Sequence, residues 1–159
     1  DYIQELYSSI ESITDDPNSI CGIGIGAPNA SKNGTIETPA NLKWKGKLNL
    51  VEELKNKVNT EIFLSNDANC AAVGEMMYGN AKDYKDFIVI TLGTGLGSGI
   101  VSNGMLIEGS DGFAAELGHY SINNMGRLTG LGVQGGLEAY VSATGIKRTI
   151  MYMLSLIHI

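Results

Sequence analysis

Cysteine, proline and tryptophan are scarce in this 159-residue chain, which has two, three and one of them. Cys21 and Cys70 form no Cys-x-x-Cys pair, so we expect no disulfide framework and predict two small core residues in a reducing, cytoplasmic protein. No apolar run is long enough for a membrane-spanning helix. The N-terminal DYIQELYSSIESI also lacks the basic flank and apolar core of a signal peptide.

Positive charge is also in short supply. Eleven lysines and arginines face 17 acidic residues, for a net charge of -6, so no basic surface is expected to bind nucleic acid. Hydrophobic residues make up 43% of the chain, which excludes disorder and allows a buried core. We therefore expect a mildly acidic globular protein of one domain or parts of two lobes, without a membrane or nucleic-acid partner.

Helix and strand patterns alternate along the chain. Ile3, Leu6 and Ile10 share one face of an expected N-terminal helix, and Asn49 is expected to cap a helix over residues 50–59. Strands are expected at residues 19–28, 61–65, 86–93 and 120–123, and further helices at 67–78, 113–119, 136–144 and 146–154. This mixed order predicts the α/β class.

Glycine is abundant, with 21 residues. Gly130, Gly132 and Gly135 in GLGVQGG match the G-x-G-x-x-G spacing of dinucleotide sites. However, the segment follows a polar loop rather than a strand, and MLSLIHI, at the distance of the ribose-binding acidic residue, has no carboxylate. NAD binding is therefore not predicted. The similar spacing in GIGIGA is followed by turn residues rather than a helix and is rejected as well.

A third glycine segment, TLGTGLGSG, is better placed to bind an anion. A strongly apolar strand leads into it, and its glycines allow backbone N–H groups to turn toward a phosphate without obstruction by Cβ atoms. The lysine of a P-loop is missing, which excludes that class of site. The residues alone leave two interpretations, a phosphate-binding turn or a tight hairpin.

Polar residues follow the expected elements at several points. Asn66 and Asp67 lie where a strand gives way to a helix, and Asp67 is either a helix N-cap or a general base for a substrate hydroxyl. Glu116 and His119 are three residues apart, a spacing that suits a local polar contact, a metal or hydrogen bonds to a polyol. Glu138 can favour a helix N-terminus through the helix dipole.

The chain resembles the ROK family of bacterial sugar kinases and related repressors in six segments that keep the family's order: GIGIGAPN, GTIETPANLKW, SNDANCAAVGE, FIVITLGTGLGSGIVSNGMLIEG, AAELGHYSI and GGLEAYVSATGI. The resemblance extends nearly to IKRTIMYML. It implies an actin-like, ribonuclease-H-like ATPase fold of two lobes with a sugar and ATP between them. Residues 1–66 would be the remainder of the N-terminal lobe, and residues 67–159 a partial C-terminal lobe.

The resemblance also implies a role for each polar residue. Asp67 would deprotonate a hexose hydroxyl, commonly the one on C6, for attack on the γ-phosphate of Mg-ATP. The remaining sugar ligands would be Asn41, Asn66, Glu116, His119 and Glu138, and the phosphates would lie along Thr94, Gly95 and Gly97. The implied activity is that of a glucokinase-like enzyme, with glucose as the first candidate substrate, and dimers are common among such relatives.

Family members usually carry C-x-C-G-x-x-G-C where this chain has TGLGVQGG, and these three thiolates close a zinc site with the histidine of the Gly-His motif. Here the three positions hold Thr129, Leu131 and Gly136, so His119 is the only ligand left. We predict a loop without zinc, in which the glycines keep the path of the chain. Leu131 and Val133 are expected to supply apolar packing in place of the metal.

Two departures from the family pattern qualify the implied activity. The strand followed by D-x-G-G-T, which grips the β- and γ-phosphates, is absent, and LSLIHI does not resemble the family's continuation into the adenosine pocket. We expect an internal fragment of a sugar kinase that is inactive alone, with exposed apolar residues from 150 to 159. The alternatives are the sugar-sensing domain of a ROK repressor and an inactive sugar-binding module. Asp67 favours the kinase, because a sensor needs no base.

Overall fold

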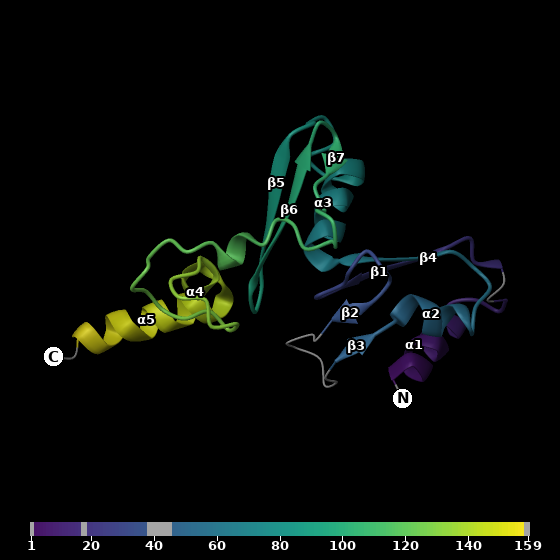
Figure 1. The fold of residues 1–159 in the computed structure, drawn as a ribbon, viewed down its shortest axis with the longest axis horizontal. Helices are drawn as coiled ribbons and strands as arrows, with labels where there is room; N and C mark the ends of the chain where they lie inside the picture. Colours follow the sequence, from purple (N-terminus) through teal and green to yellow (C-terminus); the bar gives the residue numbers. More distant parts are fainter. Residues whose placement is uncertain (1, 17–18, 38–45, 158–159) are drawn as a thin grey trace. The chain divides into compact units, whose positions relative to one another are not determined.

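The computed structural model describes residues 2–16, 19–37 and 46–157, which form two compact units (Figure 1). The first unit comprises Asp1–Asp67 and Gly109–Phe113, and the second comprises Ala68–Glu108 and Ala114–Ile159. Both mix helices with strands, as the α/β class requires. The assignment of residues 1–66 and 67–159 to the lobes of a whole kinase stays a prediction.

In its described residues, the first unit combines two α-helices with two pairs of short strands. The helices are α1 (Tyr2–Glu11) and α2 (Leu50–Lys55). Strand β1 (Ile23–Ala27) pairs in parallel with β4 (Ile62–Asn66), and β2 (Ile36–Glu37) pairs antiparallel with β3 (Lys47–Leu48). The parallel pair runs in register from Ile23 beside Ile62 to Ala27 beside Asn66.

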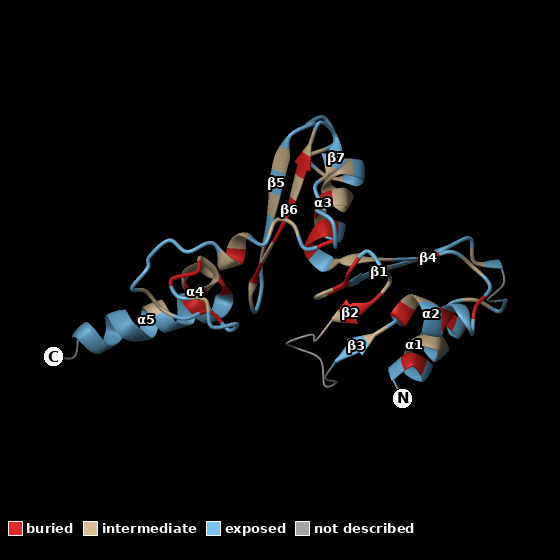
Figure 2. Ribbon diagram, in the orientation of Figure 1, coloured by how far each residue is buried: buried red, intermediate tan, exposed pale blue. Residues whose placement is uncertain are grey.

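The core of the first unit lies where α1 and α2 meet these strands, and its buried positions are red in Figure 2. Ile3 and Ile10 face inward from α1, which confirms the predicted amphipathic helix. Asn49 also caps α2 as predicted, because its side-chain oxygen accepts the N–H of Glu52 at 3.3 Å. The buried apolar residues of this core are Ile3, Ile10, Ala27, Ala30, Ile36, Leu50, Leu54, Val58 and Ile62.

The second unit contains a three-stranded antiparallel sheet. Strand β5 (Phe87–Leu92) pairs with β6 (Leu96–Ser102), which pairs in turn with β7 (Met105–Leu106). At the turn before β7, the Asp86 carboxylate accepts hydrogen bonds from the Asn103 N–H at 3.0 Å and the Ser102 hydroxyl at 2.8 Å. These two bonds, that of Asn103 first, hold the pKa of Asp86 below its usual value.

Two glycines of β6 permit close packing of α3 (Asp67–Tyr78). A Cβ atom on Gly97 would lie 2.9 Å from the Cβ of Ala68, and one on Gly99 would lie 2.5 Å from the Cβ of Ala72. The segment TLGTGLGSG, expected to form a phosphate-binding turn or a tight hairpin, is therefore a turn over only part of its length. The chain turns at Gly93–Gly95 and is already a strand from Leu96 onward.

The expected helix over residues 113–119 is reduced to the 3-10 turn η2 (Leu117–His119). Ala115 has a φ of 67°, a left-handed conformation that an α-helix cannot include. The expected strand at residues 120–123 is also wrong, since only Ser121 forms a β-bridge, to Gly136.

The expected helix over residues 136–144 is interrupted at Ser142. Ser142 separates α4 (Glu138–Val141) from α5 (Ala143–Ile157), because its backbone is extended, with a ψ of 164°. Its hydroxyl oxygen accepts the Gly145 N–H at 3.1 Å. Gly145 lies against α4, where a Cβ atom would come within 2.7 Å of the Tyr140 carbonyl carbon. The two helices can therefore meet only because residue 145 lacks a side chain.

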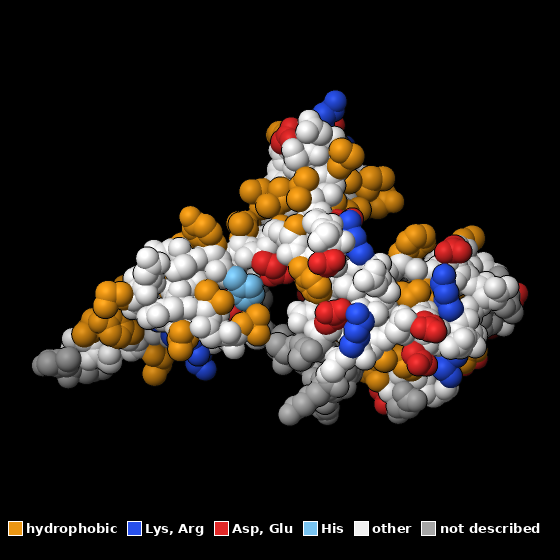
Figure 3. All heavy atoms as spheres, viewed as in Figure 1, with side chains coloured by type: hydrophobic (Ala, Val, Ile, Leu, Met, Phe, Trp, Pro, Cys, Tyr) orange, Lys and Arg blue, Asp and Glu red, His pale blue; other side chains and the backbone are white. Residues whose placement is uncertain are grey.

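Apolar side chains are exposed on the second unit, as the orange atoms of Figure 3 indicate. Ile88, Ile90 and Leu92 form an exposed row on β5, and α5 is exposed from Ile150 to Ile157, which confirms that expectation for the described residues. Cys21 and Cys70 are also exposed, so their prediction as core residues is wrong. No helix in residues 2–157, as far as the structure describes them, has the length and apolarity to span a membrane.

Candidate functional site

The Glu138 carboxylate lies in a niche lined by glycines, at the start of α4. Its Oε2 accepts the Leu96 N–H at 3.0 Å. A Cβ atom on Gly95 would lie 2.5 Å from the same oxygen, and one on Gly118 would lie 3.4 Å from the Glu138 Cβ. The missing side chains of these glycines make room for a carboxylate beside the backbone of the turn.

Residues 93–96 form the turn between β5 and β6, called the glycine hairpin below. Hydrogen bonds from other segments fix the first and the last residue of this turn. Its own closure is the bond from the Gly93 N–H to the Gly95 carbonyl, at 3.0 Å. The Gly93 carbonyl accepts the N–H of Ala143 at 3.0 Å, while the N–H of Leu96 reaches Glu138. Thr94 and Gly95, predicted to line phosphates, are thus fixed to α4 and α5.

The turn that carries Glu116 and His119 is attached to β6. The hydroxyl of Ser98 donates to the Ala115 carbonyl and accepts the Leu117 N–H at 3.3 Å. Glu116 Oε2 lies 3.8 Å from His119 Nε2, so the predicted local contact is present without a helix to carry it. The buried Nδ1 atom of His119 has no hydrogen-bond partner in the described chain.

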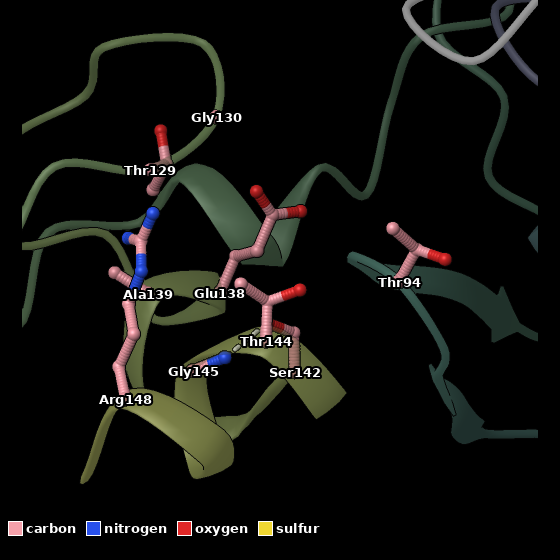
Figure 4. Close-up of a pocket in the computed structure, with 9 residues that line it drawn as sticks. All are labelled: Thr94, Thr129, Gly130, Glu138, Ala139, Ser142, Thr144, Gly145 and Arg148. Atoms are coloured by element: carbon pink, nitrogen blue, oxygen red, sulfur yellow. Dashed lines mark hydrogen bonds between the residues drawn. The ribbon is translucent and has the colours of Figure 1, made fainter. Parts of the chain in front are cut away.

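A pocket of about 110 Å³ opens beside the Glu138 carboxylate (Figure 4). Figure 4 shows Glu138 between the loop of Thr129 and Gly130 on one side and Thr94 on the other. The sequence predicted two of the lining residues, Thr94 and Glu138. It missed Ser142, Thr144 and Arg148, which line the pocket because the chain breaks between α4 and α5. The sequence signal for this break was Ser142 followed by the small residue Ala143, because a serine side chain can hydrogen-bond to the backbone and interrupt a helix.

The loop Thr129–Gly136 is closed by hydrogen bonds and does not fit a zinc ion. The N–H of Thr129 donates to the Val133 carbonyl at 2.9 Å, and the Thr129 hydroxyl accepts the Val133 N–H at 3.1 Å. A Cβ atom on Gly136 would lie 2.5 Å from the Thr129 Cγ2. These positions hold no thiolate, and the described residues contain no group of three or more His, Cys, Asp or Glu arranged to bind a metal.

The apolar packing expected in this loop is wrong for Leu131, whose side chain is 65% exposed. Two arginines instead tie the adjoining segment to the helices, and one of them is Arg148 of α5, which donates to the Leu128 carbonyl at 3.3 Å. The Arg127 guanidinium donates to the Thr149 hydroxyl at 2.6 Å and the Gly145 carbonyl at 3.3 Å. It also lies 5.3 Å from the centre of the Tyr140 ring, within range of a cation–π contact.

Of the remaining predicted residues, Gly97 lies in β6 of the second unit and packs against α3, whereas Asn66 and Asp67 belong to the first unit. Asn66 ends β4 and Asp67 begins α3, so both lie at the carboxyl end of the parallel pair formed by β1 and β4. This is the edge where α/β sheets usually bind ligands. Asn41 falls outside the described residues. That Asp67 shares a sugar site with Glu116, His119 and Glu138 of the second unit stays a prediction.

Comparison with known proteins gives one consistent result. The model of the ROK family matches residues 1–157. A glucokinase of Thermotoga maritima is 35% identical over 93% of this chain and 47% of its own length. A xylose repressor of Caldicellulosiruptor bescii is 34% identical over 91% of this chain and 37% of its own. This chain thus spans less than half of either relative.

Among solved structures, a ROK family glucokinase from Streptomyces griseus, in complex with glucose and AMPPNP, superposes with a TM-score of 0.78 at 33% identity. The match covers 92% of this chain and 47% of that one. The mixed helices and strands described above are therefore part of the actin-like ATPase fold of ROK sugar kinases.

Proposed function

Because the chain belongs to the ROK family, we propose that the protein containing it phosphorylates a hexose with ATP, most favourably glucose at the C6 hydroxyl. The observation that carries this proposal is the bond from the Leu96 N–H to the Glu138 carboxylate. It joins a turn suited to phosphate and a side chain suited to a sugar hydroxyl within one compact unit. The glucokinase relatives support the same activity.

In the proposed reaction, the Asp67 carboxylate takes the proton from the sugar hydroxyl while the oxygen of that hydroxyl attacks the γ-phosphorus of ATP. The bond from that phosphorus to the β,γ-bridging oxygen breaks, and ADP leaves. Mg²⁺ would neutralise charge on the phosphates when the nucleotide is bound. Thr94, Gly95 and Gly97 would lie along the phosphates.

Sugar recognition in this proposal uses short polar side chains. Asn41, Asn66, Glu116, His119 and Glu138 would each pair with a hydroxyl that loses its water on binding, which makes their hydrogen-bonding pattern selective. No zinc enters the proposal, because Thr129 and its neighbours close their loop by hydrogen bonds. A cytoplasmic location and a homodimer remain predictions.

A second candidate function is sugar sensing in a transcriptional repressor. The identity to a xylose repressor, 34%, is nearly as high as that to the Thermotoga maritima glucokinase, 35%. A sensor would need the sugar ligands without the base or the nucleotide. We prefer the kinase because Asp67 is present at the carboxyl end of β4.

The test is ADP formation by the whole protein that contains this chain, over a panel of glucose, N-acetylated amino sugars, fructose, allose and xylose. Asp67→Asn should lower kcat by about 10²–10⁴-fold, because loss of a general base typically costs that factor. Calorimetric binding of glucose should persist in this variant. Equal turnover by the variant and its parent would remove Asp67 from the mechanism, and binding of sugar without any ADP formation would favour the sensor.

A further inference from the structure

We propose that Glu138 is a positioning residue for the nucleotide as well as a sugar ligand, because its carboxylate holds the glycine hairpin in place through the Leu96 N–H. This inference rests on the proposed function for the identity of the ligands. It adds that one carboxylate acts on both halves of the site. Sugar contact at Glu138 and phosphate contact at the hairpin would then depend on each other.

The first argument is how the hairpin is attached. The closing bond between Gly93 and Gly95 lies within the turn, so it does not fix the turn to the rest of the unit. Besides the pairing of β5 with β6, two bonds in the described part of the chain do so, from the Ala143 N–H to the Gly93 carbonyl and from the Leu96 N–H to Glu138 Oε2, each at 3.0 Å. The bond to Glu138 is the one that depends on a side chain.

The second argument is the fit of the carboxylate against the hairpin. A methyl group on Gly95 would lie 2.5 Å from Glu138 Oε2, too close for the carboxylate to keep its place. On its other side, Glu138 Oε1 would lie 3.9 Å from a Cβ atom on Gly130, in the loop that borders the pocket. One oxygen is therefore committed to the hairpin, while the other lies toward the pocket (Figure 4).

The third argument is chemical. A bond from a backbone N–H to an ionised carboxylate is stronger than one between neutral groups. Loss of Glu138 leaves the Leu96 N–H without this acceptor, and the turn can then leave the conformation that we propose receives phosphate. Such an effect acts through the hairpin, so it should be present even when no sugar is bound.

The experiment uses the whole protein that contains this chain, with three single variants. Glu138→Ala removes the acceptor. Gly95→Ala displaces it from the opposite side, and Gly95 does not have a positive φ, so alanine does not strain the backbone there. Glu116→Gln is the matched control, because it changes another predicted sugar ligand, which lies beside His119. Exchange at Ile100 and Val101 in β6 reports whether each variant is folded.

Two quantities are measured in sugar-free buffer: hydrogen exchange of the Leu96 amide, and Kd for Mg-AMPPNP. Glu138→Ala and Gly95→Ala should each accelerate exchange at Leu96 by about tenfold or more and weaken AMPPNP binding by a similar factor. The double variant should be no worse than either single variant, since both break one contact. Glu116→Gln should change neither quantity.

Unchanged exchange at Leu96 in folded Glu138→Ala would overturn the proposed contact. Faster exchange with unchanged AMPPNP affinity would overturn the positioning role. Variants that lose the β6 reporters are replaced by Glu138→Gln, which keeps an oxygen acceptor without the charge and should accelerate exchange less than tenfold. A protein that forms no ADP yet shows the expected changes would refute the kinase and leave the positioning role standing.

Discussion

The two units of this chain are stabilised in different ways. The first unit has a closed apolar core, in which large side chains such as Ile36, Leu50 and Leu54 are almost fully buried. The second unit buries mainly small residues, such as Ala68 and Ala72, and leaves the apolar row of β5 and most of α5 exposed. Its loops are fixed by individual hydrogen bonds that pass close to glycines. In the described residues, a closed apolar core therefore characterises the first unit, and loops fixed by single hydrogen bonds characterise the second.

The largest effect should come from the core of the first unit. Leu54→Ala should lower the free energy of unfolding by about 2–5 kcal/mol, because it leaves a cavity where the native side chain is fully buried. Ile150→Ala is the control, since its parent side chain on α5 is 52% exposed and should change stability by about 0.5 kcal/mol or less. Urea unfolding, together with amide hydrogen exchange in β1 and β4, measures the loss of stability in each of the two variants. Equal losses of unfolding free energy in the two variants would contradict the expected difference between the two units.

A smaller and more local effect is expected in the loop Thr129–Gly136. Thr129→Val keeps the shape of the side chain but removes the acceptor of the Val133 N–H, at a cost of about 1–3 kcal/mol in local stability. Thr129→Ser keeps the acceptor and should lose less. Exchange of the Val133 amide distinguishes the two variants.

The same loop provides a test for metal. Washing the protein with a chelator should leave its Tm and the exchange of Val133 unchanged, because hydrogen bonds close the loop. Elemental analysis should find no stoichiometric zinc. A chelator-sensitive Tm would show that a metal contributes to this unit and would contradict the proposed closure.

The smallest effect concerns Asp86, which is exposed to solvent. Its pKa is lowered in the fold by the Asn103 N–H and then by the Ser102 hydroxyl. A carboxyl group of this kind stabilises the fold above its unfolded pKa, and the contribution is lost as pH falls through the folded pKa. The protection of the Asn103 amide, measured as its exchange rate relative to the intrinsic rate at the same pH, should therefore fall below about pH 4. Asp86→Asn should abolish this pH dependence, and a variant that retains it would assign the effect to another group.

Local features were predictable from the sequence because they depend on neighbouring residues. The inward face of α1 and the Asn49 cap of α2 follow from side-chain spacing alone. The α/β class follows from the order of such patterns. The six segments resembling the ROK family pointed to the family, which the family match confirms.

Features that depend on distant contacts were not predictable. The bond from Leu96 to Glu138 joins residues 42 positions apart, and no local pattern indicates it. The positive φ of Ala115 ended an expected helix, although alanine usually favours one. Gly97 and Gly99 were assigned to a turn because glycine in a sequence does not reveal whether it serves a bend or a close helix, as it does here beneath α3.

Gly145 sets the dimensions of the pocket from its own place in the pocket wall. Glu138 borders the pocket from α4, whereas Thr144 and Arg148 border it from α5, and the two helices touch at residue 145. A methyl group added at residue 145 would push α4 and α5 apart and so widen the pocket. The polar groups that line the pocket would not change chemically. The size of ligand that the pocket accepts would then be set by how closely two helices pack, and not by the polar groups on its walls.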